Sequence, residues 1–384
     1  MRKAVKWGVR GLLAVIVVAA IGAAWNWERL LRLYRVNTLF DEANIVSNFS
    51  DMKGMFFWAP VPRSGPVHEW PVSLSEMPQT YLWNGETKPI SDWLEDTRTT
   101  SLLVVKDGNI VFEDYYLGTG QDDRRVSWSM AKSFLSAMFG IAAEQGTIDS
   151  LDDPVTKYVP ELATSAYNGV PIRHVLNMAS GVKFDENYLD FYSDINRMGR
   201  VLALGASMDE FTGSITERER ESGKARQYVS IDTHVLAMVL RAATGKSLID
   251  YMSEQLCSKL GVKEDAYYLT DGFGTAFALG GLNMRTRDYA RFGQLFLNNG
   301  TWQGERIVPA GWVLASVTPS APPAAKENDT FQYGYQWWIP EDADGEYFAV
   351  GIYSQYIYVN PKANVVIVKT SSHRKFRADD NEGY

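Results

Sequence analysis

Ser129 and Lys132 are the residues whose types and spacing most directly suggest chemistry. They stand three positions apart at the front of an apolar run, Ser129 to Gln145, that ends at Gly146. Residues at this spacing share one face of a helix. A serine becomes nucleophilic beside a base, and a lysine with a desolvated ammonium can be that base. The pair therefore predicts acyl transfer, with a simple helix-capping role for Ser129 as the alternative.

The Ser-x-x-Lys pattern is short, and context separates its occurrences. It also begins at Ser50, Ser180 and Ser372. The first lies in a stretch punctuated by glycine and proline, the second is followed at once by Gly181, and the third lies in a polar tail. Only Ser129 opens a long helical pattern, so we take it as the candidate nucleophile.

A serine nucleophile of this kind also needs a proton relay and donors for the oxyanion. Tyr228-Val-Ser230 places a phenol and a hydroxyl just before a predicted helix, Ile231 to Ala243. The alternative is that Ser230 caps this helix and Tyr228 packs. Gly351 lies inside a predicted strand, where glycine often marks a close approach of backbone to ligand; an ordinary bulge is the alternative.

Other chemistries lack their sequence signatures. There is no Gly-x-Ser-x-Gly, the four histidines have no metal-ligand spacing, and no glycine-rich phosphate loop precedes a helix. We therefore predict neither a metal nor a cofactor. The net charge of −8 argues against nucleic-acid binding. The single Cys257 excludes an intramolecular disulfide framework.

The N-terminus combines basic residues with an apolar segment, Gly11 to Trp25. This pattern is typical of an export signal or a signal anchor. Cleavage could occur near Gly22-Ala-Ala, but extension back to Ala4 gives about 22 residues, enough to span a bilayer. We favour a retained anchor in the inner membrane, with the body facing the periplasm or the cell exterior. If the segment is cleaved, the protein is exported. The basic residues are Arg2, Lys3, Lys6 and Arg10.

Beyond this segment, β-rich runs occur near both ends of the chain and helical patterns occupy the middle. A hairpin is predicted around Asp107-Gly108, and short strands are predicted between residues 330 and 370. We therefore expect an α/β fold with one antiparallel sheet built from the two ends, flanked by helices, plus an all-helical lobe. The expected divisions are a signal segment at 1–27, a juxtamembrane helix and linker at 28–80, and a hydrolase domain at 81–384. Within that domain we expect an α/β lobe at about 81–148 and 275–384, and a helical lobe at about 149–274.

Several ordered segments, from about Trp83 to Lys369, give the chain a family resemblance. It resembles the serine β-lactamase-related hydrolases, in the branch of class C β-lactamases, esterases and 6-aminohexanoate-dimer hydrolases. The matching segments are Ser127-Trp-Ser-Met-Ala-Lys-Ser-Phe, Asp152-Asp-Pro-Val-Thr-Lys-Tyr-Val-Pro-Glu-Leu, Ile172-Arg-His-Val-Leu-Asn-Met-Ala-Ser-Gly-Val, Tyr228-Val-Ser, Gly280-Gly-Leu-Asn-Met-Arg-Thr-Arg-Asp-Tyr-Ala-Arg-Phe-Gly and Gly351-Ile-Tyr-Ser-Gln-Tyr-Ile.

The resemblance implies the α/β fold with a helical lobe that is expected above, and an acyl-enzyme formed on Ser129. It implies that Lys132 helps to remove the proton and that Tyr228 acts as base or relay, and which of the two is the base stays open. Ser230 would hold the proton network or the leaving group. The backbone N–H groups of Ser129 and Ile352 would form the oxyanion hole.

Three further residues are substrate-binding candidates by the same resemblance. Gly351 and Tyr353 flank Ile352, and Tyr188 lies in the loop Asp185-Glu-Asn-Tyr-Leu-Asp190, which resembles the loop that closes over substrate in the nylon-oligomer branch. Aromatic residues at 333, 335, 337 and 338 could line an apolar cleft or pack against the sheet.

The sequence also departs from this family's pattern, because Gly351-Ile stands where many relatives carry Lys-Thr-Gly or His-x-Gly, and Lys-Thr-Gly is absent. The cation that would meet a β-lactam carboxylate is therefore missing, and Tyr-x-Ser in place of Tyr-x-Asn points the same way. We expect a hydrolase for a small-molecule or peptide-like ester or linear amide, bound to the membrane through its N-terminal segment. The alternatives are a DD-peptidase or β-lactamase acting on peptidoglycan-type substrates, and a non-catalytic envelope module. No oligomeric state is predicted.

Overall fold

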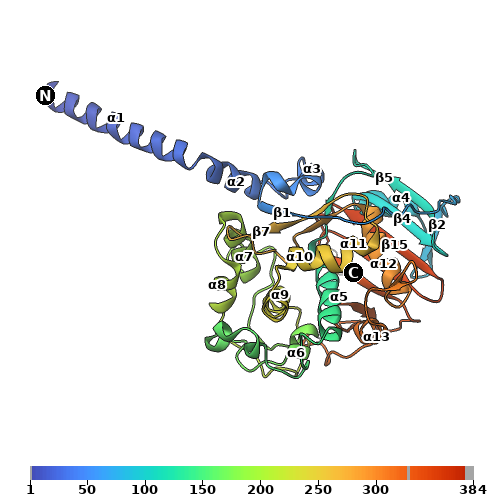
Figure 1. Ribbon diagram of the computed structural model, residues 1–384. Helices are drawn as coiled ribbons and strands as arrows, with labels where there is room; N and C mark the ends of the chain where they lie inside the picture. The colour runs from blue at the N-terminus through green and yellow to red at the C-terminus, as the bar shows by residue number, and fades with distance from the viewer. Residues whose placement is uncertain (1, 327–328, 377–384) are drawn as a thin grey trace.

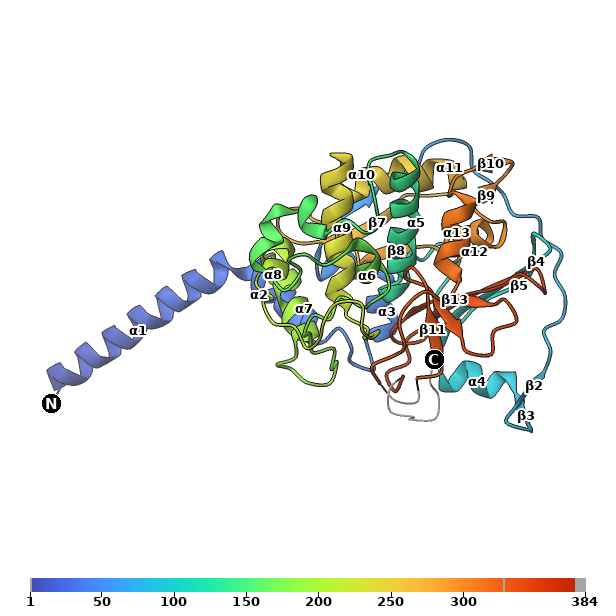
Figure 2. The same cartoon turned by 90° about the horizontal axis from the view of Figure 1, so that it is seen from below.

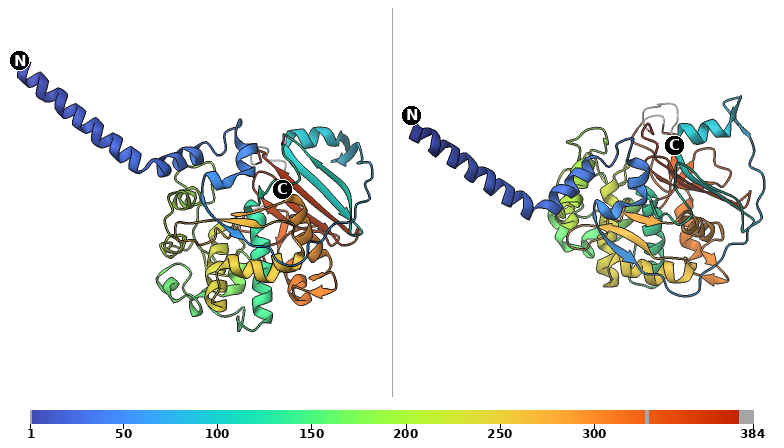
Figure 3. Two further views of the ribbon diagram at one scale, coloured as in Figure 1. Left: turned by 45° about the horizontal axis from the view of Figure 1, so that its top comes forward. Right: turned by 90° about the horizontal axis from the view of Figure 1, so that it is seen from above.

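A long apolar helix extends from a body of packed helices and sheets (Figure 1). The structure, a computed structural model, describes residues 2–326 and 329–376. Helix α1 (Arg2–Trp25) contains a 20-residue stretch, Lys6–Trp25, with a mean hydropathy of 2.0 and none of its surface buried in the body. This length and composition would suit a membrane span or a signal sequence, as the N-terminal sequence predicts. In every view α1 leaves on the side away from the largest sheet (Figure 3).

The largest sheet, within the described residues, has seven antiparallel strands in the order β11-β12-β13-β14-β15-β4-β5. The two ends of the chain meet where β15 pairs with β4, with Val368 opposite Leu103. The prediction of a sheet built from both ends is therefore confirmed. The hairpin around Asp107-Gly108 is also confirmed, as β4 and β5. The strands are β4 (Thr99–Lys106), β5 (Asn109–Tyr115), β11 (Phe331–Tyr333), β12 (Trp338–Pro340), β13 (Tyr347–Gly351), β14 (Gln355–Asn360) and β15 (Val365–Ser371).

Helices pack against the seven-stranded sheet, and their buried side chains form the hydrophobic core with it. Helix α12 (Thr286–Leu297) packs against β14, β15 and β4. Its Gly293 lies against the sheet so closely that a Cβ there would come within 2.6 Å of a Val366 methyl. Helix α5 (Ala131–Glu144) contacts α13 (Ala310–Val317) and α9 (Ser230–Thr244), and most of its residues are buried. The short helix α4 (Ile90–Asp96) packs against β4.

A second sheet corrects two of the predicted divisions. Its strands β1 (Phe57–Val61), β7 (Ala266–Thr270), β8 (Leu282–Met284) and β6 (Arg125–Val126) run in the order β1-β7-β8-β6. Strand β7 lies inside the segment predicted to be all-helical. Strand β1 lies inside the predicted linker and pairs with β7 along its whole length. Both strands are short, and their periodicity was too brief to distinguish from loops.

The remaining described elements are mostly helical. Helix α2 (Trp27–Asn37) follows α1 after one residue and contacts α7, and α6 and α8 contact α9 (Figure 2). Helices α6 to α11 lie in the middle of the chain, where helical patterns were predicted. The elements not yet given bounds are the helices α3 (Ile45–Ser50), α6 (Ile172–Leu176), α7 (Asp194–Leu204), α8 (Met208–Gly213), α10 (Leu248–Met252) and α11 (Ser258–Leu260), the 3-10 turns η1 (Met52–Gly54), η2 (Trp128–Met130), η3 (Val155–Lys157) and η4 (Pro160–Thr164), the π-turn η5 (Ser253–Cys257), and two hairpins, β2 (Thr80–Trp83) with β3 (Glu86–Pro89) and β9 (Thr301–Trp302) with β10 (Glu305–Arg306).

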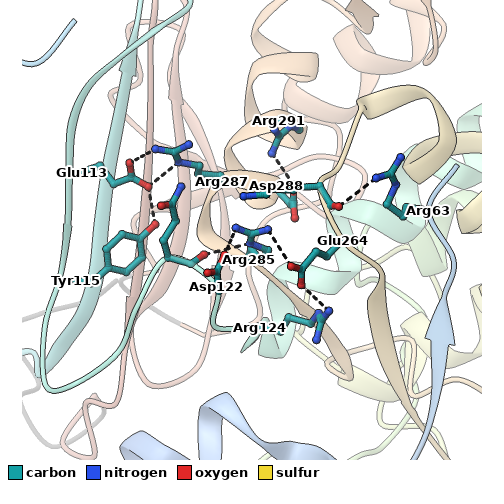
Figure 4. Close-up of polar contacts among 12 residues, drawn as sticks. Arg63, Glu113, Tyr115, Asp122, Arg124, Glu264, Arg285, Arg287, Asp288 and Arg291 are labelled. Atoms are coloured by element: carbon teal, nitrogen blue, oxygen red, sulfur yellow. Dashed lines mark hydrogen bonds and ion pairs between the residues drawn. The ribbon is translucent and has the colours of Figure 1, made fainter. Parts of the chain in front are cut away.

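A network of ion pairs around the start of α12 joins the two sheets (Figure 4). Arg287 makes two hydrogen bonds to Glu113 on β5, of 2.8 and 2.6 Å. Arg285, with its side chain 3% exposed, pairs with Asp122 and lies 3.8 Å from Glu264. Guanidinium groups match carboxylates in such paired geometry. The network joins the start of α12 to β5 and to the segments that precede β6 and β7.

Candidate active site

The turn that carries Ser129 is strained and tightly held. Trp128 has a φ of 43°, in the left-handed region that residues with a Cβ seldom adopt. The preceding Ser127 N–H donates to the Leu282 carbonyl of β8 at 2.8 Å. On its other side lies β13, where a Cβ on Gly351 would come within 2.5 Å of the Ser127 carbonyl oxygen. Glycine is thus required at 351 for β13 to approach the turn.

Lys132 lies one turn into the helix and points at Ser129. Its Nζ donates to Ser129 Oγ at 2.8 Å, to the Leu279 carbonyl at 2.9 Å and to Ser230 Oγ at 3.4 Å. The lysine is 2% exposed, whereas Ser129 is half-buried and accessible. Burial lowers the pKa of Lys132 to about 7, against an opposing effect of Glu186. At neutral pH a large fraction of this amine is therefore unprotonated and able to accept the Ser129 proton.

This pairing distinguishes Ser129 from other serines that stand in the same sequence pattern. Lys183, three residues after Ser180, pairs with Glu217 at 2.7 Å. Lys53, three residues after Ser50, lies over the Trp58 ring at 4.1 Å. The sequence criterion of a long apolar helix thus selected the serine that the structure joins to its lysine.

Glu186 is a residue of the site that the sequence did not reveal. Its carboxylate accepts from the Ser230 N–H at 3.1 Å, from the Ser230 hydroxyl through a short hydrogen bond, and from the Tyr188 hydroxyl at 2.8 Å. Ser230 in turn accepts from Lys132, so a chain of hydrogen bonds runs from Ser129 to Glu186. Its only signal was its place two residues before Tyr188 in an acidic loop. A run of acidic residues is more often a solvated face.

Tyr228 lies beside the Ser129–Lys132 pair. Lys132 Nζ is 5.1 Å from the centroid of its ring. The Tyr228 ring also stacks on Trp338 of β12, with 5.4 Å between the centroids. Trp338 is half-buried, whereas the other three aromatic candidates of that segment, Tyr333, Tyr335 and Trp337, are buried in the core. Of that set, Trp338 is the one beside the site.

Tyr353 follows Ile352 and belongs to an aromatic cluster. It has a φ of 63°, and its ring contacts Phe40, Phe49, Trp128 and Phe376, with centroid separations of 5.0, 5.2, 5.9 and 4.7 Å. Burial raises the pKa of its phenol, which therefore stays protonated. Phe376 also contacts Tyr188, 6.3 Å between centroids. The cluster forms a wall beside the nucleophile turn.

A fully buried carboxylate lies behind the site. Asp232 on α9 accepts from the Tyr167 hydroxyl at 2.6 Å and is fully buried. Burial raises its pKa to about 7. Its place two residues after Ser230 puts it in the field of Glu186, which opposes its ionisation.

The arrangement of sheets and helices, with the Ser129–Lys132 pair at the start of α5, is that of the serine β-lactamase/penicillin-binding-protein-like α/β fold. A solved structure of the penicillin-binding protein homologue of Pyrococcus abyssi has this fold; it is 17% identical and aligns over 74% of this chain and 72% of its own, with a TM-score of 0.57.

The comparisons with known proteins also give the family. The family model described as "Beta-lactamase" matches residues 92–384, and this chain belongs to that family. It is 33% identical over 291 residues to a 6-aminohexanoate-dimer hydrolase of Paenarthrobacter ureafaciens, covering 73% of this chain and 74% of the relative. A solved structure described as a "putative 6-aminohexanoate-dimer hydrolase" from Bacillus anthracis is 27% identical and covers 87% of this chain and 90% of its own, with a TM-score of 0.78.

Proposed function

We propose that this protein is a membrane-anchored serine hydrolase that cleaves an ester or a linear amide through an acyl-enzyme on Ser129. The observation that carries the proposal is the 2.8 Å hydrogen bond between Ser129 Oγ and a buried Lys132 whose pKa is about 7. The similarity to a relative named for a linear amide dimer supports the substrate class.

The proposed mechanism follows the site's hydrogen bonds. Neutral Lys132 takes the Ser129 proton while Oγ attacks the substrate carbonyl carbon. The N–H groups of Ser129 and Ile352 stabilise the oxyanion, a contribution of about 3 kcal/mol per donor in comparable sites. The intermediate collapses to the acyl-enzyme as the leaving alcohol or amine takes a proton, either from Lys132 directly or through Tyr228. Water then attacks the ester, its proton passes back to Lys132 and then to Ser129 Oγ, and the acid is released.

Ser230 and Glu186 have supporting roles in this proposal. Ser230 accepts a hydrogen bond from the Lys132 amine and helps to hold it in position. The Glu186 carboxylate orients the Ser230 hydroxyl and stabilises Lys132 once it has accepted the proton. Gly351 at the end of β13, Tyr353 in the turn after it and Tyr188 in the loop before α7 lie around the proposed substrate position.

Labelling of the full chain with a fluorophosphonate probe tests the nucleophile. We expect a stoichiometric adduct that peptide mapping places on Ser129 and that Ser129→Ala abolishes. Ser47→Ala is the control, since Ser47 is an exposed serine whose hydroxyl donates only to the nearby Asn44 carbonyl; the adduct on Ser129 should be unchanged in this variant. An adduct on another serine, or an equal adduct in Ser129→Ala, would overturn the assignment.

A substrate panel then tests the reaction class. We expect hydrolysis of esters, 6-aminohexanoate oligomers or amides by wild type and none by Ser129→Ala. Stable acylation by a fluorescent penicillin, with no turnover of these esters and amides, would instead indicate a DD-peptidase or β-lactamase activity.

A further inference from the structure

The end of the body from which α1 leaves exposes an unusual set of apolar side chains. Helices α2 and α7 lie at this end, in contact with each other (Figures 1 and 2). The loop before α7 exposes Leu189, Phe191 and Tyr192 by 89, 61 and 81%. Leu204, at the other end of α7, is 50% exposed. Large apolar side chains in such a group mark an interaction surface more often than a free one.

Cations accompany these apolar groups. Arg200 lies over the Phe191 ring at 4.1 Å and precedes Leu204 by four residues, so both lie on one face of α7. Arg32 on α2 lies over the Phe57 ring at 3.8 Å. Helix α2 as a whole carries Arg29, Arg32 and Arg35 against Glu28, although the chain as a whole has a net charge of −8. The loop itself carries Asp185, Glu186 and Asp190; Asp185 accepts from the Asn187 N–H and Glu186 from Ser230 inside the site, and Asp194 at the start of α7 pairs with Arg197 at 3.0 Å.

We propose that this end, formed by α2, α7 and the loop of residues 185–193, lies on the surface of an anionic phospholipid bilayer. The proposal rests on the proposed anchoring by α1. Helix α2 begins two residues after α1 ends, with only Asn26 between them. No linker separates the span from the body, so an inserted α1 holds α2 at the headgroups. Arginine over aromatic rings, with tryptophan at 25 and 27, suits that interface.

The position of the loop gives this surface a consequence for substrate choice. The same loop that exposes Leu189 and Tyr192 carries Glu186, which accepts from Ser230, and Tyr188. The catalytic hydrogen-bond network is thus continuous with the bilayer-facing loop. The substrate class that fits is an amphiphilic ester or linear amide that partitions into the membrane and reaches Ser129 from it.

Site-selective labelling tests where the loop lies. Cys257 is the only cysteine of the chain and is fully buried, so a cysteine introduced at an exposed site takes a thiol-reactive NBD label alone. The full chain carrying Leu189→Cys is reconstituted in vesicles of phosphatidylglycerol and phosphatidylcholine, with or without doxyl-labelled lipid. Leu314→Cys is the matched control, because Leu314 is 65% exposed on α13, on the far side from α1 (Figure 1).

We expect doxyl lipid to reduce NBD fluorescence several-fold at 189 and not at 314. Tyr192→Cys should behave as Leu189→Cys and covers the case in which one variant labels poorly. An unquenched label at both loop positions overturns the proposal: water-like emission means a solvent-exposed loop, and blue-shifted emission means contact with protein, such as a second copy. Intact mass shows separately whether α1 is retained, and fluorophosphonate labelling shows separately whether Ser129 is active.

Hydrolysis of two esters tests the substrate class. With the double change Leu189→Glu and Tyr192→Glu in the same vesicles, we expect a several-fold loss on a long-chain p-nitrophenyl ester and no change on p-nitrophenyl acetate. Equal losses on both, or no loss on either, would contradict entry of substrate from the membrane.

Discussion

Glu186→Gln should make the lysine of the dyad a weaker base. The Glu186 carboxylate and Lys132 Nζ are separated by one hydroxyl group, that of Ser230, 3.4 Å from Nζ. With an ordinary O–H···O length this path is about 6 Å. At an effective dielectric constant of about 20, a unit charge at that distance contributes about 3 kcal/mol, or about 2 pKa units. Glutamine keeps an acceptor for Ser230 while it removes the charge, so the pKa of Lys132 should fall from about 7 toward 5.

The pH dependence of Ser129 labelling measures this change without a known substrate. In wild type, the second-order rate constant for a fluorophosphonate should rise with pH as Lys132 loses its proton, with a midpoint near 7. In Glu186→Gln that midpoint should lie one to two units lower, about pH 5 to 6, and the plateau should fall because the less basic amine accepts the proton less readily.

Glu217→Gln is the control, because Glu217 is an exposed carboxylate paired with Lys183. Its midpoint should equal that of wild type. A Glu186→Gln profile with the wild-type midpoint would refute the electrostatic argument, even if its plateau fell, because a merely structural role would lower the rate without moving the pKa. A midpoint above 7 would contradict the sign.

Four other substitutions have definite expected outcomes. Lys132→Arg should keep the fold by circular dichroism and lower the labelling rate of the nucleophile by about 10²–10⁴-fold, since arginine cannot act as a base. Tyr228→Phe should lower kcat with little effect on KM if the phenol relays protons; an unchanged kcat would exclude that role. Gly351→Ala should destabilise by about 1–3 kcal/mol in urea unfolding, since its Cβ would lie 2.5 Å from the Ser127 carbonyl oxygen; unchanged stability would show that β13 can move away. Burial raises the pKa of Asp232 from 3.8 to about 7 in the folded protein, so this carboxyl should cost wild type about 3 kcal/mol of stability as pH rises from 4 to 7, and Asp232→Asn should remove that share of the loss; equal pH dependence of unfolding in the two proteins would refute this.

The contact between Ser129 and Lys132 and the main sheet could be predicted because their signals are local in sequence. Ser129 and Lys132 share one helical turn, and a long apolar helix after them sets them apart from other Ser-x-x-Lys sequences. The sheet strands have β-rich runs with turn residues between them. The pairing of β15 with β4, which joins the two ends of the chain in one sheet, followed from the occurrence of such runs at both ends of the chain.

The rest of the site depends on contacts that no local pattern encodes. Glu186 reaches Ser230 across 44 residues, and nothing in its acidic loop distinguishes it from its neighbours. The Leu279 carbonyl that holds Lys132 comes from backbone, so its residue type carries no signal. Strands β1 and β7 are five residues each, and each can be recognised as a strand only from its pairing with the other.

The predicted linker is the division that matters most for function, because it belongs to the site. Ile45 and Phe49 of α3 are completely buried, and Phe49 packs against Trp128 at 5.5 Å between centroids. The buried guanidinium of Arg125 donates to the Val46 carbonyl at 2.6 Å and to Ser50 Oγ at 2.8 Å. A segment held by these contacts cannot act as a flexible tether between an anchor and an independent enzyme. The segment that follows the apolar N-terminal helix is instead packed against the wall beside Ser129, so α3 belongs to the same packed body as the candidate site.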